Sequence, residues 1–390
     1  MNSRSPLNVL VAGGGVAGLE ALLALRDLAG DRVQTTLLEP SSEFVFRPMA
    51  TAETFGRGHG ERIRMTRIAE DVGAHLVVGG LAGVDDKRRV VTVDNGDELE
   101  YDALLVATGA TSEPAFRRAI TWTPEADPEL FGGLRRDIEE GYAHSVSFVV
   151  PPLNAWPLPA YELALMLAWD ARGMGQGDVQ ISVVTPEHAP LEMFGHAGIA
   201  AVQHDLDEAG VSVRTSAYVE ESDDPPGFVV QPGHHPLEAT RVVALPKANG
   251  PHIAGLSADE AGFIPVDGHG HVHGSERVWA AGDATVFPIK QGGLAAQQAD
   301  AAAEAIAALA GADIEPHPFR PVLRGMLLTG RGRDWMRSEI AGGGGAAVAD
   351  RHALWWPPTK VAGRYLAPYL QETAETGTPS GVAVDLDLDT

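Results

Sequence analysis

The chain has 390 residues, 44% hydrophobic and 21% charged, with a formal net charge of −24. These values predict a soluble globular protein of two or three domains. The acidic charge argues against nucleic acid and anionic lipid as partners, because both attract basic surfaces. The chain contains no cysteine, which excludes disulfides, iron–sulfur clusters, thiolate-bound metals and a dithiol redox relay.

The first fifteen residues, MNSRSPLNVLVAGGG, run directly into an expected strand without an apolar leader. No segment approaches the roughly 18 apolar residues that a membrane-spanning helix needs. We therefore expect a cytoplasmic protein. Peripheral contact with a membrane stays open but is not favoured.

A glycine-rich turn separates the first expected strand, residues 7–13, from the first expected helix, residues 16–28. The turn has the pattern G-x-G-x-x-G, and the residues expected at a cofactor are Gly13, Gly15, Val16, Ala17 and Gly18. Glycines permit the tight turn and let the backbone approach a pyrophosphate at the helix N-terminus. The next strand ends at Glu39, where an acid binds a ribose hydroxyl pair. The alternative is a glycine turn without a ligand.

Two later segments indicate which dinucleotide binds. Residues 101–110, YDALLVATGA, and residues 277–288, RVWAAGDATVFP, resemble signatures of flavoproteins with two dinucleotide-binding domains. The resemblance implies non-covalent FAD in a discontinuous first domain, with a second domain inserted into it. The further FAD contacts that it implies are Ala107, Thr108, Gly109, Gly282 and Asp283.

The resemblance narrows to one branch of the pyridine nucleotide-disulfide oxidoreductase-like flavoproteins. FVFRPM at 44–49 and FPIKQGGLAAQQADAAAEAIA at 287–307 are similar to type II NADH dehydrogenases and sulfide:quinone oxidoreductases. In that branch a helix begins beside the pyrimidine edge of the flavin, where its dipole stabilises the anionic reduced ring. The residues carried over are Arg47, Lys290, Gly293 and Leu294. Arg47 could instead pair with a local acid, and Lys290 could be a solvated side chain.

The corresponding turn of the second domain has no glycine. A strand (HSVSFVV) and a helix beginning at Ala160 flank PPLNAWPLPAYE, residues 151–162. Proline removes N–H donors and side chains block a phosphate, so an NAD cradle of the usual kind is not expected. Sulfide:quinone oxidoreductases also depart from the glycine motif here. Their reactive cysteine corresponds to the neighbourhood of Trp156, which could wall off the flavin.

Glu162 matches a glutamate that lies near the reactive edge of the flavin in both relatives. The resemblance implies a role in quinone or proton traffic, and a buried carboxyl there would have a raised pKa. The alternative is a first-turn glutamate that complements the helix dipole. We name Glu162, Lys290 and Trp156 as candidate catalytic residues.

Two further regions have no assigned chemistry. His269, His271 and His273 alternate and could share one face of a strand, but an exposed hairpin edge is favoured over a metal site, and no metal is expected. In residues 354–370, Trp355, Trp356, Tyr365 and Tyr369 with Lys360 and Arg364 could form an interfacial membrane element. Packing over the flavin or at a homodimer interface is at least as plausible. The tail from Gln371 is acidic and expected to be mobile.

The predicted fold class is α/β: two Rossmann-like, doubly wound, three-layer domains, the second inserted in the first, plus a C-terminal section. The expected boundaries are 1–110 and 245–315 for the FAD domain, 111–244 for the second domain and 316–390 for the C-terminal section. The expected activity is two-electron transfer through FAD between a small-molecule donor and a quinone-like acceptor. An NAD(P)H-dependent reductase with an atypical nicotinamide site and a non-catalytic flavin-binding protein are the alternatives.

Overall fold

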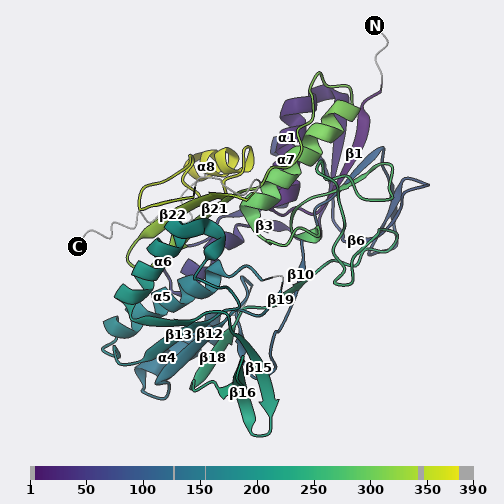
Figure 1. The fold of residues 1–390 in the computed structure, drawn as a ribbon. Coiled ribbons are helices and arrows are strands. Elements are labelled where there is room, and N and C mark those ends of the chain that lie inside the picture. Colours follow the sequence, from purple (N-terminus) through teal and green to yellow (C-terminus); the bar gives the residue numbers. More distant parts are fainter. Residues whose placement is uncertain (1–4, 126–127, 154, 341–346, 377–390) are drawn as a thin grey trace.

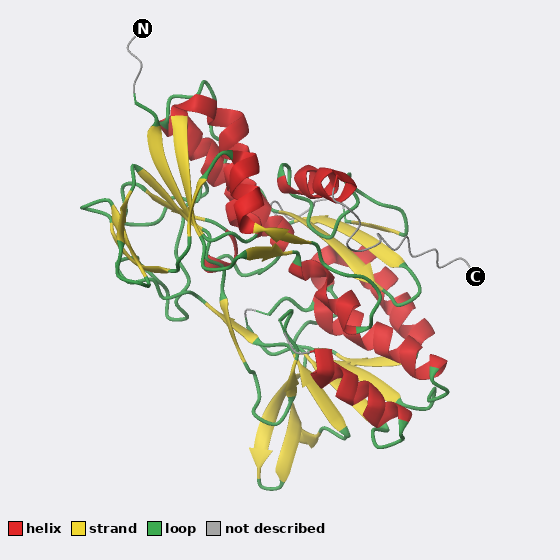
Figure 2. Cartoon of the chain, turned by 180° about the vertical axis from the view of Figure 1, so that it is seen from behind, coloured by secondary structure: helices red, strands yellow, loops and turns green. Residues whose placement is uncertain are grey.

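The computed structural model describes residues 5–125, 128–153, 155–340 and 347–376. Two lobes, each built on a parallel sheet, are joined by a thin two-stranded connection, and a C-terminal section packs against both (Figure 1). Figure 2 shows from behind that the helices of each lobe gather on one side of its sheet.

The first lobe contains a five-stranded parallel sheet of order β20-β9-β1-β2-β5. Its strands are β1 (Leu7–Ala12), β2 (Val33–Leu38), β5 (His75–Val77), β9 (Ala103–Val106) and β20 (Val278–Ala280). On one face lie α1 (Val16–Ala29), α3 (Met65–Val72) and α7 (Gly292–Leu309), and on the other β6 (Leu81–Asp85), β7 (Val90–Val93) and β8 (Glu98–Glu100). Both faces are covered, so β1 is apolar at successive positions: Val9 and Val11 face the helices, Leu10 and Ala12 the small sheet.

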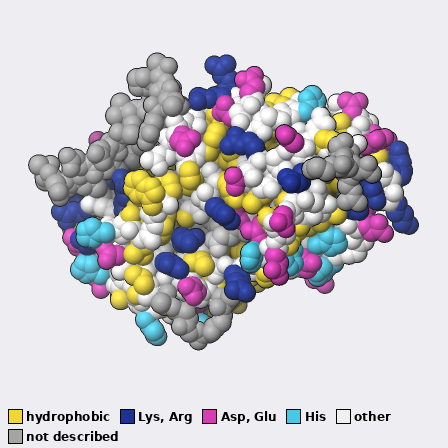
Figure 3. Space-filling view, turned by 90° about the horizontal axis from the view of Figure 1, so that it is seen from above, with side chains coloured by type: hydrophobic (Ala, Val, Ile, Leu, Met, Phe, Trp, Pro, Cys, Tyr) yellow, Lys and Arg dark blue, Asp and Glu magenta, His cyan; other side chains and the backbone are white. Residues whose placement is uncertain are grey.

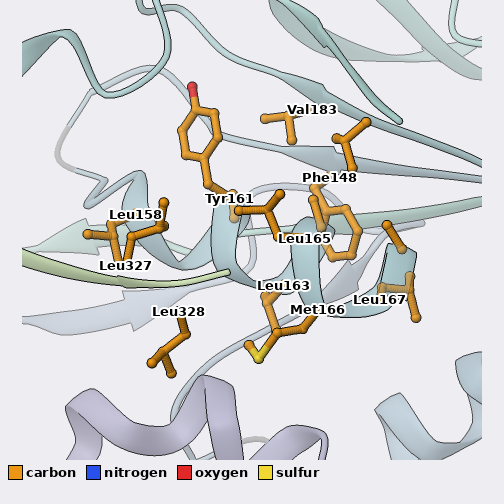
Figure 4. Close-up of a cluster of buried hydrophobic side chains, with 14 of the residues drawn as sticks. Phe148, Leu158, Tyr161, Leu163, Leu165, Met166, Leu167, Val183, Leu327 and Leu328 are labelled. Atoms are coloured by element: carbon orange, nitrogen blue, oxygen red, sulfur yellow. The ribbon is translucent and has the colours of Figure 1, made fainter. Parts of the chain in front are cut away.

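The second lobe repeats this plan with a parallel sheet of order β11-β18-β12-β13-β14. Its strands are β11 (Ile120–Thr121), β18 (Arg241–Ala244), β12 (Ser145–Val149), β13 (Gln180–Val184) and β14 (Val211–Arg214). The helices α4 (Pro128–Glu139), α5 (Leu158–Gly173) and α6 (Gly195–Ala209) cover one face, and β15 (Tyr218–Asp223), β16 (Pro226–Gln231) and β17 (His235–Pro236) the other. Figure 4 shows side chains of α5 among those of β12, β13 and β21 (Val322–Leu328), a strand of the C-terminal section.

The two sheets match strand for strand. In this match β1 corresponds to β12, β2 to β13, β5 to β14, β9 to β18 and β20 to β11, and all the pairings are parallel. The prediction of two nucleotide-binding-type domains in a three-layer α/β architecture, the second inserted in the first, is therefore confirmed. The third layer of each lobe is a small antiparallel sheet in place of further helices.

Short elements connect the lobes. The antiparallel pair β10 (Thr111–Glu113) and β19 (Lys247–Asn249) carries the chain into and out of the second lobe. A short helix, α2 (Ala50–Thr54), follows the hairpin strand β3 (Glu43–Val45) and precedes β4 (Arg62–Arg64), and it contacts α4 and α5.

The C-terminal section is a meander followed by a helix. Its elements are β21 (Val322–Leu328), β22 (Arg333–Glu339), β23 (Val348–Asp350) and α8 (Leu366–Thr376). β21 packs on α5 and α7, β22 and β23 on α6, and α8 on α1, so the section joins the two lobes. Seen from above, hydrophobic side chains form separate patches among charged ones (Figure 3). Within the described residues, no helix combines the length and apolar character needed to cross a bilayer.

Candidate active site

At Gly13 and Gly18 the backbone of the first turn leaves no room for a side chain. Gly13 has φ +111°, and a Cβ added to it would collide with the carbonyl of Ala107 at the end of β9. A Cβ on Gly18 would overlap the carbonyl oxygen of Gly13, so α1 lies in direct contact with the turn. Gly15 is different, because a Cβ there would meet nothing within 4 Å. The turn is packed on two sides and open at Gly15.

Glu39 is already oriented by this turn. The N–H of Gly14 donates to Glu39 Oε2 at 2.5 Å, and the N–H of Ser41 donates to Oε1 at 2.8 Å. Its buried carboxylate lies directly after β2, beside the opening at Gly15. The acid and the turn are thus one hydrogen-bonded unit.

Asp283 and Lys290 lie together beyond the carboxyl end of β20. Burial raises the pKa of Asp283 to about 6 although Lys290 opposes the shift, and burial lowers the pKa of Lys290 to about 8 against the attraction of Asp283. The Lys290 ammonium donates to the Thr285 carbonyl at 2.5 Å and lies 3.6 Å from the centre of the Phe263 ring. Lys290 is therefore a buried cation rather than a solvated one.

The helix α7 begins immediately after Lys290. Its first turn is capped by Gln291, whose side chain accepts from the Leu294 N–H at 2.8 Å. The glycine at 282 donates its N–H to Gln298 Oε1 at 2.7 Å, which ties the turn after β20 to α7. Gly293 and Leu294 are buried at this helix start.

Glu162 forms a buried ion pair that the sequence did not reveal. Lys360, from the C-terminal section, approaches both carboxylate oxygens at 2.6 and 2.7 Å. Thr51 on α2 donates to Oε2 at 2.7 Å, and the Leu328 N–H donates to Oε1 at 2.9 Å. Burial lowers the pKa of Lys360, while Glu162 acts in the opposite direction. One carboxylate thus joins α2, α5, β21 and the loop before α8.

The second turn is longer and filled. Residues 150–157 separate β12 from α5, whereas residues 13–15 separate β1 from α1. The acid after β13, Glu187, accepts from the phenol of the fully buried Tyr161 at 2.8 Å and from Thr185 Oγ1 at 2.9 Å. Figure 4 shows the Tyr161 phenol extending away from the apolar side chains of α5. Burial raises the pKa of Glu187 to about 7. The acid that matches Glu39 is therefore occupied by side chains of its own domain.

The other candidates divide into buried and exposed groups. Trp156 is half-buried and packs edge-on against Phe194, with 6.2 Å between ring centroids. Arg47 forms a 2.7 Å ion pair with Glu125 on the surface, which is the local-acid alternative. At the cofactor turn, Val16 is half-buried and Ala17 buried, while Thr108 is exposed.

The histidine run and the aromatic C-terminal segment make several contacts with neighbouring parts of the protein. His271 packs edge-on against Trp279 at 5.3 Å, and no cluster of metal-ligating side chains exists among the described residues. Trp356 is 79% exposed, but Trp355 packs edge-on against Trp335. Tyr369 donates to Asp71, Arg364 pairs with Glu304, and Lys360 is buried. Lys360 is thus removed from the surface, whereas Trp356 and Arg364 remain exposed. The predicted mobile tail begins at Gln371, but residues 371–376 belong to α8, and the remainder of the tail lies outside the described residues.

Comparison with known proteins agrees with this architecture. The chain is 28% identical over 201 residues to the sulfide-quinone reductase of Aquifex aeolicus, a match that covers 50% of this chain and 46% of that relative. The crystal structure of the sulfide:quinone oxidoreductase from that bacterium matches with a TM-score of 0.79 at 19% identity, over 88% of this chain and 87% of the other.

Two further structures share the fold. An NAD-dependent persulfide reductase from A. fulgidus matches with a TM-score of 0.60 at 20% identity, over 86% of this chain and 64% of that one. A ferredoxin reductase from Rhodopseudomonas palustris matches with a TM-score of 0.63 at 19% identity, over 86% and 83% of the two chains.

The family model described as pyridine nucleotide-disulphide oxidoreductase matches residues 7–121 and 160–306. The gap between the two matched segments contains the proline-rich turn and the strand before it. The prediction of an oxidoreductase of this kind without redox cysteines is confirmed, and the chain belongs to the pyridine nucleotide-disulphide oxidoreductase family.

Proposed function

We propose that this protein is an FAD-dependent oxidoreductase that passes two electrons from a small reduced donor to a quinone or quinone-like acceptor without a cysteine relay. The contrast between the two nucleotide turns carries the proposal. The first turn keeps the glycines, and its acid Glu39 accepts from backbone N–H groups of the turn. The second turn has no glycine, and its acid Glu187 accepts from the side chains of Tyr161 and Thr185. Of the two matching domains, the first alone keeps a turn suited to a dinucleotide. This favours one resident dinucleotide cofactor and disfavours NAD(P)H as a second, donor dinucleotide.

The first turn fits FAD. The open position at Gly15 leaves room for a pyrophosphate at the N-terminus of α1, and Glu39 can accept a ribose hydroxyl. Further contacts are expected from the ends of β9 and β20. The residues that would hold FAD are Gly13, Gly15, Val16, Ala17, Gly18, Glu39, Ala107, Thr108, Gly109, Gly282, Asp283, Lys290, Gly293 and Leu294.

Bound FAD would supply reversible two-electron chemistry, and the protein would supply orientation, charge and protons. The start of α7 and the Lys290 cation favour negative charge on the nearby part of the cofactor. Asp283, with its raised pKa, can accept a hydrogen bond from a ribityl hydroxyl or give up a proton near neutral pH.

The Glu162–Lys360 pair is suited to proton supply. Reduction of a quinone to a quinol consumes two protons for two electrons. Lys360 carries protons in a buried position and has a lowered pKa, and the Thr51 hydroxyl lies 3.4 Å from its Nζ. A proton leaving Lys360 can be replaced through Thr51 or Glu162 without exposing the site to water. Trp156, near α5, would limit access to the cofactor from the second lobe.

The acceptor assignment also draws on the relatives, which are named as quinone reductases. Because the C-terminal section joins both lobes through β21 and α8, it is the element that would cover the cofactor and shape the acceptor pocket. A peripheral membrane contact is not required for this function.

The experiment is anaerobic flavin spectroscopy. The purified protein, reconstituted with FAD if necessary, should release about one FAD per chain on denaturation. After stoichiometric reduction with dithionite, a water-soluble quinone should reoxidise it rapidly, and NADH should not bleach it at a comparable rate. Failure to bind FAD would overturn the cofactor assignment. Rapid bleaching by NADH would overturn the proposal that the second domain no longer binds a nicotinamide dinucleotide. A reduced flavin that no quinone reoxidises would support a non-catalytic flavin-binding role.

A further inference from the structure

The chain uses arginine for most of its cations and lysine for very few. Its 29 Lys and Arg residues include only four lysines, which are Lys87, Lys247, Lys290 and Lys360. Burial lowers the pKa of both Lys290 and Lys360. A buried lysine can release its proton near neutral pH, whereas an arginine stays charged. Lys360 forms an ion pair with Glu162, but Lys290 forms none with any residue that the structure describes.

The ring of Phe263 takes the place of a carboxylate at Lys290. The ammonium donates to the Thr285 carbonyl at 2.5 Å and lies 3.6 Å from the centre of the Phe263 ring. The face of an aromatic ring attracts a cation, most strongly where water is excluded. Lys290 is 8% exposed and Phe263 is 2% exposed, so water is largely excluded from this contact. The contact therefore favours the charged form of Lys290.

The backbone holds Phe263 in this position. Its N–H donates to Asp259 Oδ1 at 2.8 Å, and its carbonyl accepts from the Asp259 N–H at 2.9 Å. The next residue, Ile264, forms a β-bridge with Thr285, whose carbonyl accepts from Lys290. The ring and the carbonyl that contact the ammonium are thus fixed relative to each other.

Core packing alone does not explain the position of Phe263. A buried aromatic ring ordinarily belongs to an apolar core, and the neighbouring Ile264 lies in the core between the first sheet and the small sheet. Phe263 belongs to none of the apolar clusters that the described residues form. The contact of its ring is with the Lys290 ammonium.

Two carboxylates also act on Lys290. Burial lowers the pKa of Lys290 to about 8, and Asp283 and Asp259 oppose this effect. Burial raises the pKa of Asp283 itself to about 6, so its charge is lost as the pH falls through that value. Asp259 is exposed, so water screens its charge. Of the three groups, the Phe263 ring alone acts equally at every pH.

We infer that Phe263 is a positioning residue for the Lys290 cation. Its ring keeps the ammonium charged beside Asp283 and the start of α7, and so sets the pH range over which the cofactor meets a positive charge there. This consequence for the cofactor rests on the proposed function. A cation at this place favours negative charge on the reduced cofactor and raises its reduction potential. Without the ring, Lys290 would lose its proton at a lower pH.

Side-chain NMR of isotope-labelled lysines in the holoprotein tests the contact directly. Four lysines give four titrating signals, and Lys290→Met identifies the signal of Lys290. Phe263→Leu keeps an apolar side chain but removes the ring face, so the proton affinity of Lys290 should fall about tenfold. The matched control, Phe148→Leu, removes a ring from the core of the second lobe and should leave the Lys290 titration unchanged.

A trifluorinated phenylalanine incorporated at position 263 separates the ring face from packing. It keeps the shape of the ring but weakens the negative potential of its face, so the proton affinity of Lys290 should lie between those of the unmodified protein and Phe263→Leu. An unchanged titration in both Phe263 variants would overturn the inference. So would an equal effect of Phe148→Leu, or a fluorinated ring that acts as the natural one does.

The midpoint potential of the bound flavin, measured against pH, tests the consequence. Above a pH of about 8, reduction should take up one additional proton at Lys290, so the potential should fall more steeply with pH there. This steeper region should begin about one pH unit lower in Phe263→Leu. It should be absent in Lys290→Arg, because arginine keeps its proton.

The two measurements separate the inference from the proposed function. A lysine titration that responds to Phe263→Leu, together with a potential that does not, would overturn the consequence for the cofactor and the place assigned to FAD beside Lys290. Failure of the protein to bind FAD would overturn the proposed function, and the lysine titration of the apoprotein would still test the contact.

Discussion

Glu20 and Glu162 each stand at the fifth residue of the helix that follows a nucleotide turn, α1 and α5. Both are fully buried, and both accept hydrogen bonds from the C-terminal section. Glu162 accepts from the Lys360 ammonium and the Leu328 N–H. Glu20 accepts from the backbone N–H groups of Tyr365 and Leu366 at 2.8 and 2.7 Å. The same helical position thus anchors one C-terminal section to two domains.

Replacing Glu162 should be costly because it leaves a buried cation without its counter-charge. Breaking one side of such a pair costs about 3–5 kcal/mol. We expect Glu162→Gln to lower the free energy of unfolding by this order in urea titrations, and Glu162→Gln combined with Lys360→Met to recover part of the loss. Glu208→Gln breaks the exposed pair with Arg331 and should cost less than about 1 kcal/mol. A loss of unfolding free energy in Glu162→Gln no larger than that in Glu208→Gln would contradict a buried charge at Lys360.

Glu162→Gln should also change the pH profile of quinone reduction, because the remaining amide cannot exchange a proton with Lys360. A loss of turnover that is uniform across pH would indicate a purely structural pair.

Asp300 on α7 introduces a pH dependence of stability. Burial raises its pKa to about 8, with Glu20 and Glu304 acting in the same direction and Arg364 against them. The folded protein therefore binds a proton that the unfolded chain releases above about pH 4. Stability should fall as pH rises from about 4 to 8, by at most about 1.4 kcal/mol per unit for one proton. Asp300→Asn should flatten this slope in urea titrations, whereas Asn at the exposed Asp31 should not.

Sequence reasoning reached the residues whose roles are local. The glycines of the first turn and Glu39 follow from spacing within about 25 residues, and the strand ends at Gly109 and Asp283 follow from short signatures. Lys360 could not be reached, because it lies 198 residues from Glu162 and no pattern pairs them. The sequence placed Lys360 either in an interfacial membrane element or in a segment packed over the flavin or at a homodimer interface. Tyr161 gave no signal as a partner of Glu187, since an aromatic residue in an apolar helix is ordinarily core.

At the scale of elements, the nucleotide turns decide the difference between the lobes. The parallel strands, the helices after them and the sheet orders are the same in both. Their boundaries were predictable because buried parallel strands are continuous apolar runs and the flanking helices are long. The antiparallel third layers were not predicted, since short strands such as β6 and β17 carry little periodic signal.

Two glycines of the first turn should respond differently to alanine. Gly18→Ala places a Cβ on the Gly13 carbonyl, so helix and turn must separate, and we expect loss of FAD with a lowered melting temperature. Gly15→Ala adds a Cβ into open space at an ordinary φ of −78°, so the apoprotein should fold normally but bind FAD more weakly. FAD content and thermal unfolding of both variants check this. Normal FAD affinity in Gly15→Ala would mean that no pyrophosphate lies there.

At the scale of the whole molecule, the C-terminal section fixes the two lobes relative to each other. The pair β10–β19 is a slender link, whereas β21 and α8 pack on helices of both lobes. This joint could not be predicted, because it depends on contacts between residues far apart in the sequence. A Cβ on Gly325, for example, would collide with the ring of Phe194, and no local pattern around Gly325 indicates this.

Gly363→Ala should loosen this joint. A Cβ at residue 363 would collide with the Glu20 carboxylate, which holds the start of α8. We expect the segment after residue 360 to become susceptible to limited proteolysis while the two sheets remain folded by circular dichroism. Ala at Gly311, an exposed turn position with open space around it but φ +86°, is a control for the cost of a strained backbone alone. Equal protection in both variants would contradict the anchoring role of Glu20.

The length of the second turn bears on how the two lobes could diverge or be re-engineered. Substituting glycines into residues 150–157 would leave the extra chain in the space of a phosphate, and the Tyr161–Glu187 bond would still occupy the ribose position. Conversion to a nucleotide-binding domain therefore requires a deletion together with a tyrosine replacement. Either change alone would leave one of these two obstacles in place.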